Sequence, residues 1–100
     1  MMLGTVLLLS GPLSAQQQVA IVDMRDFTFE PRDTRILAGS AVRWINHDDV
    51  PHAIAMEEGR PGSSGLIAPA MDYTFTFRDA GRFTYRCAVH PTMLGLVIVD

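Results

Sequence analysis

The sequence has a single cysteine, Cys87, and no lysine. One thiol cannot form a disulfide within the chain, so a domain of 100 residues has to be stabilised by its core or by a bound metal. All eight basic residues are arginine, and the formal net charge of -3 argues against binding to nucleic acid. The length fits one domain.

The sequence also lacks an apolar run long enough to span a bilayer. Its longest apolar stretch is Met1 to Leu9, which is followed by small residues up to Ala15 and then by three glutamines. This pattern predicts a secretory signal peptide over residues 1–15, a periplasmic location and one mature domain over residues 16–100. No positive charge precedes the apolar run, which leaves open a cytosolic protein with an apolar N-terminal strand.

Enzyme signatures are absent as well. The sequence shows no Ser/His/Asp constellation with a plausible nucleophile, no glycine loop for phosphate and no paired carboxylates for acid–base work. We therefore expect a protein that is not an enzyme.

The sequence contains many short alternating segments separated by turn residues. The sharpest alternation is in Met71 to Phe77, where Tyr73, Phe75 and Phe77 fall on one side. Such spacing predicts an all-β protein, a Greek-key β-sandwich of seven to eight short strands. The expected strands cover residues 19–24, 27–29, 34–37, 41–46, 51–56, 71–77, 82–87 and 94–99.

The richest chemistry lies between the last two of these strands. Cys87, His90 and Met93 follow one another at intervals of three, and His52 lies upstream in a second loop. Two imidazoles and a thiolate in a plane, with a weak axial thioether, are the ligands of a blue-copper site. In a Greek-key sandwich, loops from distant parts of the chain gather at one end, which brings His52 to the other three residues.

Two alternatives bear on this ligand set. Zinc is disfavoured because methionine is a poor zinc ligand and structural zinc sites use more thiolates. His47 is the rival of His52, but His52 follows Pro51 and opens an expected strand, whereas His47 reads as a solvent-facing loop residue. The acidic neighbourhood of Asp48, Asp49, Glu57 and Glu58 reads as a solvated loop surface, with steering of a cationic partner as the alternative.

Three segments resemble the small cupredoxins. They are Tyr85 to Met93, the run Val42 to Asn46 leading to Pro51-His52, and the ending Gly95 to Val99. The two-residue gap between His90 and Met93 looks most like the amicyanins. The resemblance covers about residues 19–100. Thr92 and Val89 depart from the amicyanin pattern, which has a bulky aromatic residue and a proline at these places.

The resemblance implies a monomeric type I copper protein that carries single electrons. One copper ion would be bound by His52, Cys87 and His90, with Met93 axial, and Asn46 would tie the two ligand loops together near the sulfur. Electrons would pass through His90 and an apolar rim around it, formed by Val50, Pro51, Val89 and Pro91. An amine dehydrogenase as donor and a c-type cytochrome as acceptor are the redox partners that the resemblance implies, with no nucleic acid and no membrane insertion.

A second function for the same ligands is copper delivery or buffering in the periplasm. Copper carriers commonly use Met-rich or His-rich tracts, and the methionines of this chain are scattered. A multicopper enzyme needs a second centre with more histidines, and only His47 is left over.

Overall fold

The computed structural model describes residues 18–100, which form eight strands. The predicted signal peptide, residues 1–15, lies outside the described residues. The strands are β1 (Val19–Arg25), β2 (Thr28–Glu30), β3 (Asp33–Ile36), β4 (Ala41–Asn46), β5 (Ile54–Met56), β6 (Asp72–Thr76), β7 (Gly81–Cys87) and β8 (Leu94–Val99).

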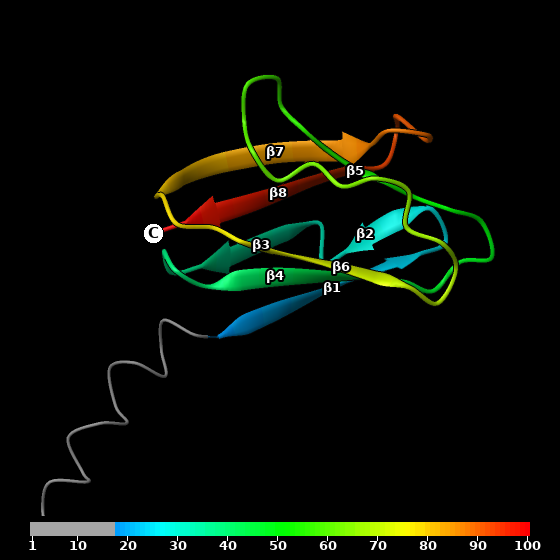
Figure 1. The fold of residues 1–100 in the computed structure, drawn as a ribbon, viewed down its shortest axis with the longest axis horizontal. Coiled ribbons are helices and arrows are strands. Elements are labelled where there is room, and N and C mark those ends of the chain that lie inside the picture. The colour runs from blue at the N-terminus through cyan, green and yellow to red at the C-terminus, as the bar shows by residue number, and fades with distance from the viewer. Residues whose placement is uncertain (1–17) are drawn as a thin grey trace, which may run out of the picture.

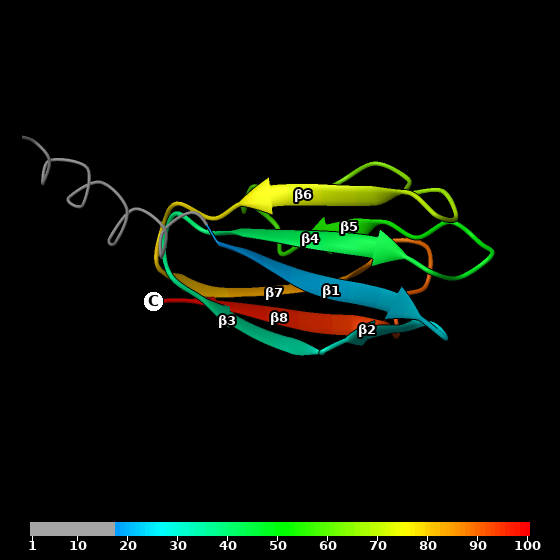
Figure 2. The same ribbon diagram turned by 90° about the horizontal axis from the view of Figure 1, so that it is seen from below.

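The strands form two four-stranded sheets packed face to face, which confirms the predicted all-β sandwich (Figures 1 and 2). The strand order is β2-β1-β4-β6 in one sheet and β3-β8-β7-β5 in the other. β1 runs parallel to β4 and β3 runs parallel to β8, whereas the other neighbours are antiparallel. Parallel neighbours need crossover connections, so the chain passes repeatedly between the sheets.

The core lies between the sheets and follows the period of two that strands impose. On β7, Phe83, Tyr85 and Cys87 point inward, whereas the residues between them are exposed. Trp44 of β4 is fully buried, and its indole N–H donates a hydrogen bond to the hydroxyl of Tyr85 at 3.1 Å. Aromatic side chains that bury both their ring and their polar end in this way fix how the two sheets pack.

The fold places the two predicted ligand loops at one end of the sandwich. The loop between β4 and β5 (residues 47–53, the His52 loop) lies beside the loop between β7 and β8 (residues 88–93, the His90 loop), and the β1–β2 turn reaches the same end (Figures 1 and 2). The strand expected over 51–56 is shorter, Ile54–Met56, because His52 forms an isolated bridge with Ile67 instead. Within residues 18–100 no helix is long and apolar enough to cross a membrane.

Candidate metal centre

The His52 loop begins at Asn46, a fully buried residue that ends β4. Its amide nitrogen donates to the carbonyls of Val50 and Ile67 at 2.9 and 3.0 Å, and its amide oxygen accepts from the backbone N–H of Asp48 at 2.9 Å. His52 and Ile67 exchange two backbone hydrogen bonds of 3.1 and 2.7 Å. The loop is therefore fixed at several points, and His52 has no exposed surface.

The His90 loop is shorter and is held mainly by its own backbone. Cys87 ends β7 with a buried side chain, and its N–H donates to the carbonyl of Met93 at 3.0 Å. The N–H of Met93 donates to the carbonyl of His90 at 2.9 Å, which closes the loop. One further bond, from Ala88 N–H to the Ala53 carbonyl at 3.1 Å, joins it to the His52 loop.

Three of the four predicted ligands converge. The Nδ1 atoms of His52 and His90 are 3.2 Å apart, and Cys87 Sγ lies 3.7 and 3.6 Å from them. A point equidistant from these three atoms is about 2 Å from each, close to the roughly 2.0–2.3 Å at which imidazole nitrogen and thiolate sulfur bind a metal such as zinc. The donor set and its spacing therefore fit a transition-metal ion.

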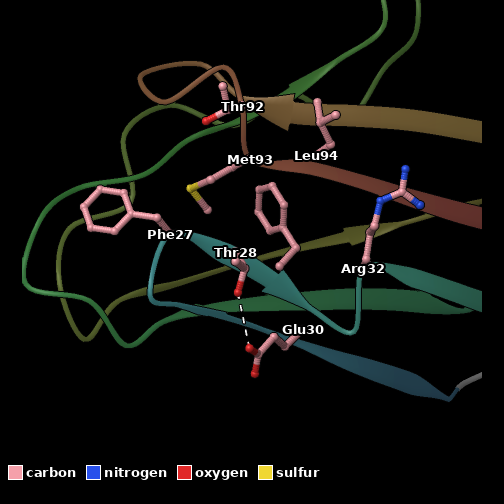
Figure 3. A pocket seen from close by; sticks show the side chains of 8 residues that line it. Phe27, Thr28, Glu30, Arg32, Thr92, Met93 and Leu94 are labelled. Carbon is pink, nitrogen blue, oxygen red and sulfur yellow. Dashed lines mark hydrogen bonds between the residues drawn. The ribbon is translucent and has the colours of Figure 1, made fainter.

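Met93, the predicted axial ligand, lies next to this triangle in the chain and is 2% exposed. Figure 3 shows its side chain extending toward Phe27, whose ring contacts both imidazoles. The axial role of Met93 rests on this placement and on the chemistry of the thioether, and it stays a prediction.

Asp48 orients His52. Its Oδ2 lies 2.8 Å from Nε2 of His52, so the carboxylate favours the tautomer in which Nε2–H donates a hydrogen bond to it and Nδ1 keeps a lone pair for a metal. Burial acts to raise the pKa of Asp48, but hydrogen bonds from the Phe27 amide, the His52 ring and the Asp26 amide outweigh it and hold that pKa below its ordinary value. The carboxylate is thus ionised at neutral pH.

The structure corrects two sequence-based expectations. Asp48 is not part of a solvated loop surface, because its side chain is only 10% exposed. Asn46 bonds within the His52 loop and to Ile67, so the expected tie to the cysteine side comes from Ala53. The N–H of Ala53 donates a hydrogen bond to Cys87 Sγ at 3.4 Å.

The sequence did not predict that two further residues, Asp48 and Phe27, contact the histidines of the site. The only sequence feature that could link Asp48 to the site is its four-residue spacing from His52 in the same loop. Phe27 belongs to a turn that is far from both histidines in the sequence. His47, the rival ligand, lies outside the triangle, and its Nε2 contacts Asp23 at 2.7 Å. Its expected place in an exposed part of the loop is confirmed.

A two-sheet sandwich that brings one buried cysteine and two histidines together at one end defines a type I copper protein, a cupredoxin. A sequence profile of the copper binding proteins of the plastocyanin/azurin family matches residues 16–100. The chain belongs to this family. Copper is accordingly its cofactor, and proteins of this class carry electrons and are not enzymes.

Known relatives place the chain nearest to one branch of the family. Amicyanin of Paracoccus denitrificans is 33% identical over 84 residues, which are 80% of this chain and 64% of that protein. Amicyanin-alpha of Methylorubrum extorquens is 31% identical over 97% of this chain and 88% of its own length. The crystal structure of amicyanin from Paracoccus versutus superposes with a TM-score of 0.77 at 29% identity, covering 82% of this chain and 81% of that one.

The chain spans slightly less than two thirds of the Paracoccus denitrificans protein. The predicted resemblance to amicyanins is confirmed by both the sequence relatives and the structural neighbour.

Proposed function

We propose that this protein is a blue-copper carrier of single electrons, in which His52, Cys87, His90 and Met93 would hold the copper ion. The observation that carries the proposal is the triangle of Nδ1, Nδ1 and Sγ atoms, with sides of 3.2 to 3.7 Å, that two separate loops form at a buried site. Copper supplies the electron chemistry by alternating between two oxidation states.

The protein's own contribution is to hold the ligands still. Cys87 lies at the end of a central strand, and His52 is fixed by Asp48 through its Nε2 atom. A site whose ligands cannot move far suits both oxidation states, and electron transfer then needs little rearrangement. The Ala53 N–H at the sulfur removes some negative charge from the thiolate and so tunes the reduction potential.

The electron exchange route that we propose runs through His90. His52 is fully buried, whereas His90 is partly exposed and stands beside Val89, which is 48% exposed, and beside the exposed Pro91. An apolar rim of this kind suits brief docking of another redox protein. By family resemblance the donor is an amine dehydrogenase and the acceptor a c-type cytochrome.

The proposal extends to the location and state of the chain. Residues 1–15 act as a signal peptide, residues 16–100 form one domain, and the protein works in the periplasm as a monomer. The apolar character of Met1 to Leu9 supports export.

The experiment is visible absorption and EPR spectroscopy of Cu(II)-loaded protein expressed without residues 1–15, beside the variant Cys87→Ser. We expect an intense thiolate-to-copper band and a narrow copper hyperfine splitting, both lost in the variant. A pale protein with ordinary tetragonal copper signals, unchanged in Cys87→Ser, would reject electron transfer at this site. The copper-delivery function would then be tested by Cu(I) affinity and transfer.

A further inference from the structure

Phe27 is an exposed aromatic residue packed against the two imidazole ligands. Its ring centroid lies 4.8 Å from that of His90 and 5.6 Å from that of His52, with interplanar angles of 84° and 86°. Edge-to-face pairs of this kind are attractive beyond the area they bury. Because 47% of Phe27 is exposed, core packing does not explain its position.

The same carboxylate that orients His52, that of Asp48, also holds the turn that carries Phe27. Asp26 and Phe27 have φ values of 54° and 60°, a left-handed conformation that is unfavourable for a bulky residue. Their two N–H groups donate to Asp48 at 2.7 and 3.0 Å, which compensates for the strain. Asp48 therefore fixes Phe27 relative to His52.

Phe27 also lines a surface cavity of about 400 Å³, together with Met93 (Figure 3). The other walls include Phe29, Thr92 and Leu94. The ring thus borders the cavity while it contacts the two histidines. The ring therefore stands between the cavity and the two imidazoles.

We propose that Phe27 is a positioning residue of the copper site. Its ring holds the imidazole of His90 in place and keeps small anions and water away from the copper. The inference rests on the proposed copper site, because a shield is useful only where a metal is bound. It differs from a docking role for Phe27, which would affect a partner protein and leave the coordination of copper unchanged.

The first test is azide titration of Cu(II)-loaded protein, followed by visible absorption and EPR. The variants are Phe27→Ala, Phe27→Leu, which keeps apolar bulk without a ring, and the control Leu94→Ala. Leu94 is 51% exposed in the wall of the same cavity. Loss of an aromatic pair corresponds to about a two- to tenfold change in affinity.

We expect Phe27→Ala to bind azide about two- to tenfold more tightly than wild type, with Phe27→Leu between them and Leu94→Ala unchanged. If azide affects the spectra of wild type and Phe27→Ala equally, or if Leu94→Ala opens the site as much as Phe27→Ala does, the inference is wrong.

The second test needs no copper. NMR spectra of the metal-free protein should show NOEs between the ring protons of Phe27 and His90, and the His90 ring signals should shift and broaden in Phe27→Leu. Absent NOEs or unchanged His90 signals would overturn the inference. A wild-type protein without the intense visible band would instead reject the proposed function, whereas a blue wild type with insensitive Phe27 variants would reject only the role of Phe27.

Discussion

The two ligand loops hold their histidines by different means. The His52 loop is built on buried and partly buried side-chain hydrogen bonds, three that involve the Asn46 amide and one between the ring of His52 and the Asp48 carboxylate. The His90 loop depends on backbone bonds between its own ends and on packing of the strand that follows it. His52 is fully buried, whereas His90 is partly exposed.

This difference assigns the loops different tasks. Hydrogen bonds shielded from water are strong and directional, so the His52 loop serves as the rigid reference of the site. The exposed side of His90 is where another molecule can reach the site with the least protein in between. A carrier of electrons needs both properties, since one ligand must be immobile and one must face the partner.

The largest effect that separates the two loops comes from removing each histidine. His52→Gly and His90→Gly should both lose the intense visible band of the Cu(II) protein. Added imidazole should restore the band in His90→Gly, because free imidazole can enter the partly exposed place of that ring. It should not restore it in His52→Gly, where the ring is fully buried and the loop closes over it.

Absorption and EPR titrations with imidazole measure this contrast, and circular dichroism checks that both variants fold. Equal rescue of the two variants would mean that the loops are equally accessible, contrary to the comparison.

The next largest effect tests the packing behind the His90 loop. A Cβ atom at Gly95 of β8 would lie 2.2 Å from Cζ of Tyr85, whose hydroxyl is held by Trp44. Gly95→Ala should therefore lower the free energy of unfolding by about 3 kcal/mol, because neither the ring nor the strand can move away cheaply. Denaturant unfolding of the metal-free protein measures this loss.

Gly65→Ala is the matched control, because no atom lies within 4 Å of its added Cβ. Its effect should stay within about 0.5 kcal/mol. If the two glycine variants unfold alike, packing at Gly95 does not hold the His90 loop.

A smaller effect tests the polar side of the comparison. Asn46→Ala removes three hydrogen bonds from the His52 loop and should lower the free energy of unfolding by about 2 kcal/mol. The Val50 carbonyl and the Asp48 N–H lose their Asn46 partner, and the buried Ile67 carbonyl keeps only the N–H of His52. Copper should still bind, and the reduction potential should shift. Cyclic voltammetry and thermal unfolding measure both, with His47→Ala as the exposed control in the same loop. If the reduction potential and the free energy of unfolding are both unchanged, Asn46 does not support the His52 loop.

The candidate ligands could be proposed from the sequence because they follow local rules. Cys87, His90 and Met93 fall in one short loop, and the strand periods of Ala41–Asn46 and Leu94–Val99 were predicted with their observed bounds. Alternation fixes which residues face the core, and a sandwich topology brings loop ends together. The neighbours of each histidine in the chain also separate His52 and His90, the candidate ligands, from His47, the solvent-facing loop residue.

The residues around the ligands could not be predicted, because they depend on contacts across the fold. In the sequence, Asp48 does not differ from other acidic loop residues. Only the fold brings the N–H groups of Asp26 and Phe27 to its carboxylate. The partners of Asn46 depend on where the segment of Ile67 runs, and no local pattern sets that course.

The smallest effect concerns a carboxylate at the opposite end of the sandwich, which provides a contrast to Asp48. Asp100 accepts hydrogen bonds from Nε and Nη2 of Arg35 at 2.7 and 3.0 Å, and both side chains are exposed. The hydrogen bond from Arg35 lowers the pKa of Asp100 below its ordinary value. Water and salt compete at this site, so the pair should contribute little to stability.

Because the pKa of Asp100 is lower in the folded state, its contribution is present above the unfolded value, roughly 3.9, and is lost as the pH falls through the folded pKa. Arg35→Gln should therefore be slightly less stable than wild type at neutral pH and equally stable in strong acid or in high salt. Urea unfolding of the metal-free proteins across this pH range measures the difference. A large loss of unfolding free energy in Arg35→Gln that persists in high salt would mean that the carboxylates at the two ends are equally shielded from water. The low exposure of Asp48 would then no longer explain why the His52 loop is the rigid one.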